Sequence, residues 1–178
     1  FKSLPNIAEG DELAINVGSN CYFTSDISNL TWLPDQPYTA GGWGYIGGKA
    51  HSTTSEIYNT LDGPIYQTWR EGNWSYKIDA PIGEYEIELL IADVTKPAAQ
   101  LANLLNKNKE EKHSGETRFH ISICGKQVET NFSPIDGGKH RTAFKRRYII
   151  RNEHDHIVIS AGAVKGEPFL AGIKVRKL

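Results

Sequence analysis

The sequence predicts an all-β fold, a jelly-roll β-sandwich built from antiparallel strands. Its clearest signal is the segment Glu84–Asp93, in which glutamates alternate with aromatic and aliphatic residues. An alternation with a period of two residues is typical of a strand with one buried and one solvated face. The segment Arg118–Cys124 repeats the pattern, and Gly125–Lys126 then leads into Gln127–Glu129, which predicts a hairpin.

Further strand-like segments follow one another at short spacing and are separated by turns marked with glycine or proline. That arrangement is typical of sandwiches and jelly rolls. These segments are Leu13–Val17, Tyr66–Trp69, Trp74–Ile78, Lys145–Arg151, His156–Ser160 and Ala171–Arg176.

One segment departs from the strand pattern. Apolar residues at Ala98, Leu101, Ala102 and Leu105 have the spacing of one helical face, and Thr95 and Pro97 suit the first turn. We therefore expect one short inserted helix over residues 97–106.

Length and composition restrict the class of protein. The chain has 178 residues and a formal net charge of -1, which argues against a nucleic-acid binder that works by bulk electrostatics. No apolar stretch is long enough to insert into a membrane. We expect a single domain over residues 1–178, with Phe1–Asp11 as a polar lead-in segment, and the lack of an initiator methionine suggests a part cut from a longer polypeptide. The only cysteines, Cys21 and Cys124, are either paired in a disulfide or two buried apolar residues.

Aromatic residues are concentrated between Trp32 and Tyr76. This quarter of the chain holds half of the aromatic residues and all four tryptophans. Its Gly41–Gly48 stretch is rich in glycine, which weakens strand interiors, and is expected to be a surface loop. Exposure is therefore favoured for Trp32, Trp43 and Tyr45, whereas Tyr66, Trp74 and Tyr76 have strand-like surroundings and suit either the core or a ligand site.

Sugars are a natural partner for exposed aromatic rings, because the C–H face of a pyranose packs on an aromatic plane. Sugar hydroxyls then need polar side chains around that platform, and apolar walls with a few polar groups are typical of small-ligand sites. Polar residues lie between the aromatic ones throughout this region, namely Asp35, Gln36, Asn59, Asp62, Gln67, Arg70, Glu71 and Asn73.

An ordered set of motifs resembles the malectin and malectin-like domains. It includes Ile15–Gly18, Trp32 followed by Asp35, and above all Ile65–Arg70. Further members of the set are Gly83, Tyr85, Ile91–Asp93, Arg118–Phe119, Gly137–Gly138 and Gly172–Val175. The predicted helix and the ending Phe169–Lys177 are similar to the C-terminal modules of family-two glycoside hydrolases, the β-galactosidase-like enzymes of glycan-degrading bacteria.

The resemblance implies a jelly-roll module that binds carbohydrate through aromatic residues and an aspartate on loops, without cleaving it. By motif position, Trp32, Trp43 or Tyr45, and Trp74 correspond to the aromatic residues, and Asp136 corresponds to the aspartate. Trp69 replaces the glutamate of the family's Tyr-Gln-Thr-Glu-Arg motif. The predicted carbohydrate-binding residues are Trp32, Asp35, Tyr38, Trp43, Tyr45, Tyr66, Trp69, Arg70, Trp74 and Asp136.

The expected function is that of a non-catalytic module in a periplasmic or secreted glycoside hydrolase. Its partners would be an oligo- or polysaccharide and the catalytic domain of the same polypeptide, with no nucleic acid and no membrane insertion. No cofactor is expected; structural calcium is common in such modules, but no ligand loop stands out. The alternative is a structural module that packs on the catalytic domain without binding sugar.

Two charged segments have competing interpretations. The run from Lys139 to Arg151 holds six basic residues without an acidic one, which suits an anionic glycan, a charged edge strand or a surface that docks on an acidic neighbour; the edge strand or docking surface is favoured. His154 and His156 suit a metal site or a solvated turn, and the turn is favoured.

Overall fold

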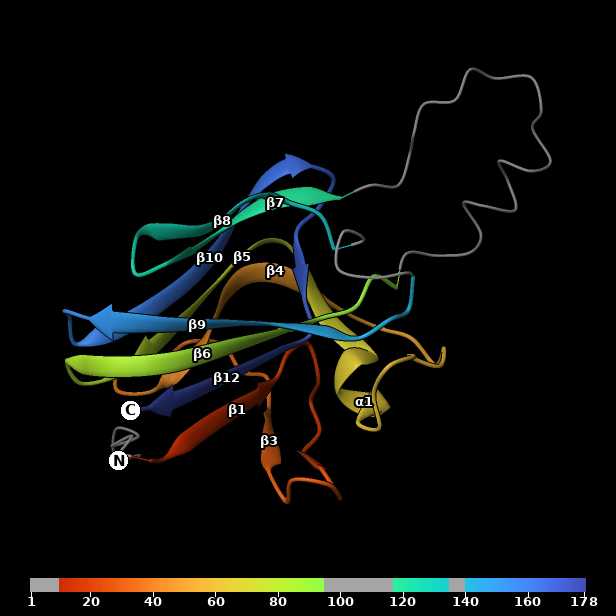
Figure 1. Ribbon diagram of the computed structural model, residues 1–178, viewed down its shortest axis with the longest axis horizontal. Helices are drawn as coiled ribbons and strands as arrows, with labels where there is room; N and C mark the ends of the chain where they lie inside the picture. The colour runs from red at the N-terminus through yellow and green to blue at the C-terminus, as the bar shows by residue number, and fades with distance from the viewer. Residues whose placement is uncertain (1–9, 95–116, 135–139) are drawn as a thin grey trace.

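The protein is described by a computed structural model that covers residues 10–94, 117–134 and 140–178. Over these residues the chain forms two sheets of mainly antiparallel strands and one helix of a single turn, which confirms the predicted all-β sandwich (Figure 1). The helix predicted at residues 97–106 and the predicted site residue Asp136 lie outside the described residues.

The first sheet has six strands, and its centre joins segments from opposite ends of the sequence. β1 lies between β12, with which it is antiparallel, and β3, with which it is parallel. In spatial order the strands are β2 (Phe23–Thr24), β3 (Thr31–Pro34), β1 (Glu12–Asn16), β12 (Gly172–Lys177), β6 (Gly83–Ile91) and β9 (Phe144–Asn152).

The second sheet is organised around one long strand, β5 (Thr68–Asp79). β4 pairs with one edge of β5 along most of its length, and β10 and β11 share the other edge. The remaining strands are β4 (Trp43–Ser52), β7 (Arg118–Ile123), β8 (Lys126–Phe132), β10 (His156–Lys165) and β11 (Phe169–Leu170). The pairing of β7 with β8 confirms the predicted hairpin.

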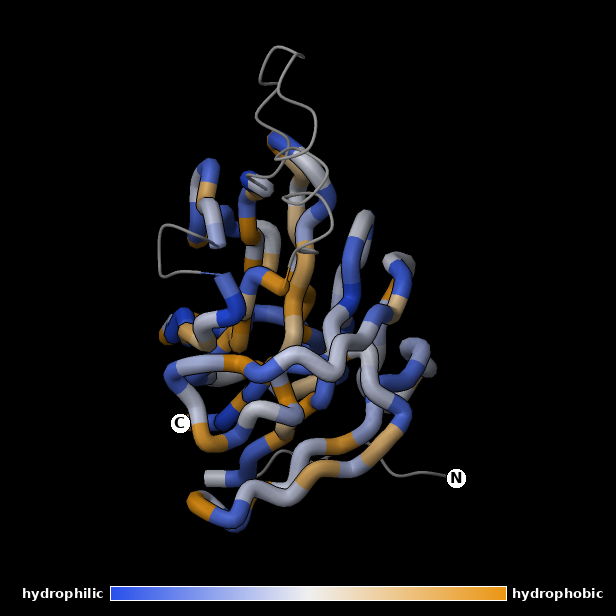
Figure 2. The backbone as a smooth tube through the Cα atoms, turned by 90° about the vertical axis from the view of Figure 1, so that its right-hand side faces the viewer, coloured by the Kyte–Doolittle hydropathy of each residue, from blue (hydrophilic) through white to orange (hydrophobic). Residues whose placement is uncertain are grey.

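The main core lies between the two sheets and follows the alternation read from the sequence. The β6 side chains of Tyr85, Ile87, Leu89 and Ile91 are fully buried against the facing side chains of β5, β7 and β10. Figure 2 shows apolar stretches of the chain in the interior of the molecule, whereas many of the turns at its periphery are polar. Burial of apolar area on this scale is the main stabilising contribution in a domain of this size.

A second, smaller apolar cluster lies on the outer face of the first sheet. It forms where β3 presents Trp32 outward and the segment that contains α1 (Gly63–Tyr66) packs over β6 and β12. Tyr66 was expected to begin a strand, but it ends this helical turn because Pro64 fixes a helical φ at its start. β5 begins only at Thr68.

The prediction of a surface loop over Gly41–Gly48 is wrong, because Trp43–Ser52 forms β4. A Cβ at Gly44 would lie 2.5 Å from the carbonyl carbon of Pro37, and one at Gly47 would lie 2.4 Å from the carbonyl oxygen of Asn73. Gly47 also has a φ of 75° beside a bulge in the pairing with β5. Glycine is therefore required here by close backbone approach within a strand rather than by an exposed loop.

The basic run between Lys139 and Arg151 largely becomes β9, an edge strand of the first sheet. The Arg147 guanidinium lies 3.4 Å from a carboxylate oxygen of Glu88 and 3.8 Å from one of Glu86, both on the neighbouring β6. Arg146, on the other face of β9, lies 3.5 Å from Glu129 of β8. These pairs agree with the interpretation of an edge strand protected by charge.

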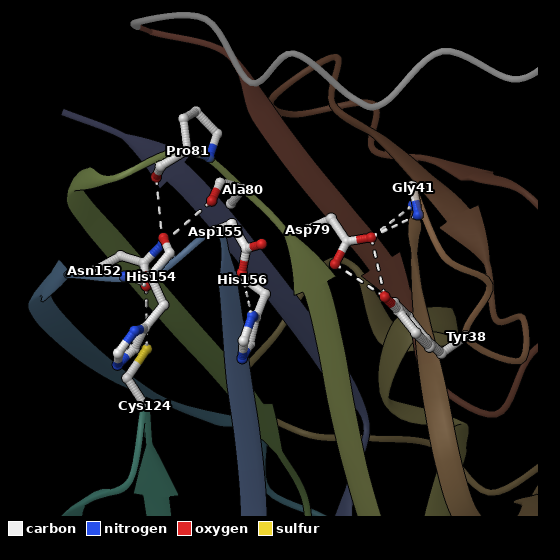
Figure 3. Close-up of polar contacts among 11 residues, drawn as sticks. Tyr38, Gly41, Asp79, Ala80, Pro81, Cys124, Asn152, His154, Asp155 and His156 are labelled. Carbon is white, nitrogen blue, oxygen red and sulfur yellow. Dashed lines mark hydrogen bonds and ion pairs between the residues drawn. The ribbon is translucent and has the colours of Figure 1, made fainter.

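The turn between β9 and β10 contains His154, ends where His156 begins β10, and is held by Asn152 (Figure 3). The Asn152 amide donates to the carbonyl oxygens of Ala80, Pro81 and His154. His156 Nδ1 lies 2.6 Å from the exposed carboxylate of Asp155. His154 and Asp155 are exposed, which agrees with the interpretation of a solvated turn.

The two cysteines are free thiols, and the expectation of two buried residues is wrong for Cys21, which is exposed, whereas Cys124 is partly buried. None of the helical structure in the described residues is long and apolar enough to cross a membrane.

Candidate functional site

A groove of about 1220 Å³ lies on the outer face of the first sheet, beside the second apolar cluster. We call it the outer groove. The turn between β2 and β3 forms one wall, the segment before α1 forms another, and side chains of β1, β6, β9 and β12 form the floor. Its lining residues are Glu12, Ile27, Ser28, Asn29, Leu30, Trp32, Asn59, Thr60, Leu61, Asp62, Tyr66, Glu88, Ala143, Phe144, Lys145 and Lys174.

Hydrogen bonds fix the walls of the outer groove. The fully buried Ser25 hydroxyl donates to Asp62 over 2.9 Å and thereby ties the β2–β3 turn to the segment before α1. The Asn59 amide donates to the carbonyl oxygen of Ala143 over 3.1 Å, which ties the same segment to the start of β9. A groove with walls held in this way loses little conformational entropy when it binds a ligand.

Two aromatic residues of the predicted set, Trp32 and Tyr66, line the outer groove. The Trp32 ring lies over Gly172, where a Cβ would come within 3.2 Å of the indole, so the missing side chain makes room for it. The Trp32 indole N–H and the Tyr66 hydroxyl make no hydrogen bond to the described residues. Among the described residues the only buried side-chain atom without a partner is Oε1 of Glu88, so the two donors are open to the groove and available to a polar ligand or to water.

A buried carboxylate, Glu88, lies at the floor of the outer groove. Oε1 of Glu88 makes no hydrogen bond to the described residues, although the ammonium groups of Lys145 and Lys174 lie 3.4 and 3.7 Å away. Burial by itself would raise the pKa of Glu88, but these two lysines hold the pKa below its ordinary value. The carboxylate is therefore ionised at neutral pH.

The Tyr66 hydroxyl lies close enough to the groove carboxylates to feel their charge. Burial raises its pKa most, and the negative charges of Glu88 and Asp62 raise the pKa further. The phenol therefore stays protonated and remains a hydrogen-bond donor at physiological pH.

Asp35, Arg70 and Tyr45 of the predicted set meet in a different place, between β3, β4 and β5. Oδ2 of Asp35 accepts hydrogen bonds from Arg70 at 3.0 and 3.1 Å, from the Tyr76 hydroxyl at 2.9 Å and from the backbone N–H of Gly18 at 2.7 Å. The Arg70 guanidinium lies 3.4 Å from the centre of the Tyr45 ring. We call these residues the Asp35 network, and its groups are paired with one another rather than presented to a ligand.

The expected exposure of the tryptophans is wrong for Trp32 and Trp43, which are 4% and 8% exposed. Trp43 and Trp74 belong to the main core, and the indole N–H of Trp74 donates to the carbonyl oxygen of Pro168. Both rings alternate with residues on the outer face of strands β4 and β5, so the strand geometry turns them inward. They contribute to the main core and do not line the outer groove.

Tyr38 and Trp69 occupy two further positions. The Tyr38 hydroxyl and the backbone N–H groups of Gly41 and Gly42 donate to Asp79, which anchors the loop before β4 (Figure 3). Trp69 stacks on His51 with ring centres 5.6 Å apart. A smaller hollow of about 520 Å³ includes His51, Glu71 and Glu167 among its lining residues.

The structure thus divides the predicted residues among several places rather than one cleft. Reasoning from the sequence missed Glu88, Lys145 and Lys174, because alternation places their side chains on the solvated face of the sheet. The outward position was predicted for Glu88 alone, as one of the alternating glutamates of Glu84–Asp93, and it was correct. The covering segment before α1, which turns this face into a groove, has no local signal in the spacing of the strands.

Comparisons with known proteins relate the chain to one domain family. The model of that family, described as the Malectin domain, matches residues 12–173. Among solved structures, Bacteroides uniformis beta-glucuronidase 2 is 45% identical, and the match covers 95% of this chain and 18% of that chain with a TM-score of 0.81. The ectodomain of the plant receptor-like kinase FER is 15% identical, with 99% and 53% of the two chains covered and a TM-score of 0.64, and shares the fold.

One curated relative was also found, a kinesin-like protein of Oryza sativa subsp. japonica. It is 28% identical over 136 residues, which are 75% of this chain and 12% of that protein. The chain therefore spans less than a fifth of the length of the beta-glucuronidase and of the kinesin-like protein. The family match extends from β1 into β12, and on that ground the chain belongs to the Malectin domain family.

Proposed function

We propose that the protein is a non-catalytic carbohydrate-binding module and that the outer groove is its glycan site. The observation that carries this proposal is the pair of unpaired donors on Trp32 and Tyr66 between walls already fixed by hydrogen bonds. Sugar hydroxyls need both donors and acceptors, which Tyr66 and Asp62 can supply, and the exposed apolar side chains of Ile27 and Leu61 offer a surface for a pyranose face. Membership of a carbohydrate-binding family gives independent support.

The other predicted residues would act indirectly in this proposal. Asp35 and Arg70 would fix the segments that follow β1 and β3. Trp43 and Trp74 would stabilise the sandwich through the main core. Neighbours of 45% identity that are beta-glucuronidases suggest a glycoside hydrolase as the parent polypeptide and a location outside the cytoplasm. The module would then keep the enzyme near its glycan and raise the local substrate concentration.

The matched substitution Tyr66→Phe tests the proposal, with Tyr22→Phe as its control because Tyr22 is exposed and lies outside the groove. Binding would be measured by calorimetry and affinity electrophoresis against a panel of soluble polysaccharides. Loss of one hydrogen bond should weaken binding about fivefold for Tyr66→Phe and leave Tyr22→Phe unchanged. Unaltered affinity in the Tyr66→Phe protein would place the glycan elsewhere.

A second candidate function is a structural module that packs on a catalytic domain without binding sugar. The burial of Trp32, Trp43 and Trp74 favours it, because these rings already have intramolecular packing partners. In that case no polysaccharide would bind the isolated chain at millimolar concentration, and deletion from the full enzyme would lower its stability rather than its substrate affinity.

A further inference from the structure

We propose that the outer groove selects neutral sugars and discriminates against uronic acids. This inference rests on the proposed function and names the substrate class of the same site. It follows from the charges that line the groove and from the partners those charges already have.

The charges around the outer groove balance. Among the described lining residues, three acidic side chains face two basic ones, namely Glu12, Asp62 and Glu88 against Lys145 and Lys174. Two arginines just outside the lining, Arg147 and Arg176, contact Glu88 and Glu12, and both also contact Glu86, so that four cations face four carboxylates. A site for an anion normally presents a surplus of positive charge that attracts the ligand and stabilises it once bound, and these residues provide no surplus.

The two lysines of the groove also share a single buried carboxylate. Both ammonium groups lie within ion-pair distance of Oε1 of Glu88, whose side chain is only 4% exposed. A uronate carboxylate that recruited these lysines would separate them from Glu88 and leave a buried anion poorly compensated. Removing the partner of a buried charge is strongly unfavourable, so the ligand's gain would be offset within the protein.

A neutral sugar hydroxyl can bind without separating Lys145 and Lys174 from Glu88. It can accept a hydrogen bond from an ammonium group or from the Tyr66 phenol while it donates to a carboxylate oxygen. Oδ1 of Asp62 suits that role, because the Ser25 hydroxyl donates only to Oδ2. Donors and acceptors that alternate along a groove therefore complement a chain of sugar hydroxyls without altering the balance of charge.

The test compares polymers that differ only in their carboxyl groups. Affinity electrophoresis would use polygalacturonate, glucuronan and alginate, each beside the same polymer after chemical reduction of its carboxyl groups to hydroxymethyl groups. The wild-type protein should be retarded by at least one reduced polymer and bind its native counterpart at least fivefold more weakly. Equal or stronger binding to the native polymers would overturn the inference and leave the proposed function intact, whereas no binding to any polymer would contradict both.

Two variants sharpen this test. Glu88→Gln removes the carboxylate that occupies the lysines, and it should shift the preference at least fivefold toward the native polymers. Glu84→Gln is the matched control, because Glu84 lies on the same strand, is exposed and does not line the groove. If circular dichroism shows that Glu88→Gln does not fold, Asp62→Asn removes a groove charge while keeping an oxygen for Ser25, and it should shift the preference in the same direction. An unchanged preference in the folded variant would contradict the inference.

Discussion

The Asp35 network and the Glu88 cluster of the outer groove are built from the same kinds of group. Each has a buried carboxylate, basic side chains and a protonated tyrosine. In the network, one oxygen of Asp35 accepts four hydrogen bonds of 2.7 to 3.1 Å. In the cluster, Oε1 of Glu88 has cations at 3.4 and 3.7 Å and no hydrogen bond to the described residues. Similar groups are thus fully hydrogen-bonded to one another in the Asp35 network, where they stabilise the fold. In the Glu88 cluster one carboxylate oxygen can still accept a hydrogen bond.

The largest change in the free energy of unfolding is expected when the Arg70–Asp35 ion pair is removed. Arg70→Met removes the cation that pairs with Asp35 and leaves that carboxylate buried, which should cost about 3–5 kcal/mol of unfolding free energy. Chemical denaturation would measure the loss, with Arg151→Met on the exposed edge of β9 as the control. If Arg70→Met lowers the free energy of unfolding no more than Arg151→Met does, the Asp35 network does not stabilise the fold.

A smaller effect is expected in the groove, where Glu88→Gln weakens the attraction to Lys145, Lys174 and Arg147. At pH 7 the cost should be about 1–3 kcal/mol. Because the folded-state pKa of Glu88 is lowered, its stabilisation is present above the unfolded pKa and is lost as the pH falls through the folded value. Denaturation midpoints of the two proteins should therefore converge below about pH 4.3. A constant difference down to pH 3 would assign the effect to something other than ionisation.

The walls of the outer groove provide an intermediate test. Asn59 has a φ of 62° and donates to Ala143, so Asn59→Ala loses a hydrogen bond in a backbone conformation that alanine disfavours. We expect a cost of about 1–2 kcal/mol and weaker glycan binding. Asn73→Ala is the control, because Asn73 is exposed and its φ is not positive. Full affinity in the Asn59→Ala protein would show that the wall does not need to be fixed.

The smallest effect is expected at the rim of the outer groove. Leu61 is 86% exposed, so Leu61→Ala should change the unfolding free energy by less than about 0.5 kcal/mol. Thermal denaturation would check this value, and calorimetry would show whether the rim contributes to glycan affinity. A clear loss of stability would reveal that Leu61 packs on the residues beneath it.

The sandwich could be predicted from the sequence because its strands alternate locally. The alternation in β6 assigned Tyr85, Ile87 and Leu89 to the core correctly. The error at β4 arose because glycine was interpreted as a sign of a loop, whereas Gly44 and Gly47 lie where another backbone approaches too closely for a Cβ. Such approaches depend on tertiary contacts and are invisible to local patterns.

The candidate site could be predicted only in part. Trp32 and Tyr66 were among the predicted residues, and both line the outer groove. Glu88 was placed correctly on the outer face, but its burial depends on Lys145 and Lys174, which come from two other strands. The groove is assembled from segments far apart in the sequence, and the local pattern of a single sequence provides no signal for such long-range neighbours.

The pairing of β1 with β12 also affects how the domain can fold. Residues 12–16 find their antiparallel partner only in residues 172–176, so the centre of the first sheet cannot close until nearly the whole chain is available. Contacts between such distant segments slow folding, because the entropy of closing the loop is lost before the contacts form. During synthesis on the ribosome, β6 and β9 can pair first. One edge of β1 stays unpaired until β12 has emerged. Chaperones that shield exposed strand edges should therefore matter most during that interval.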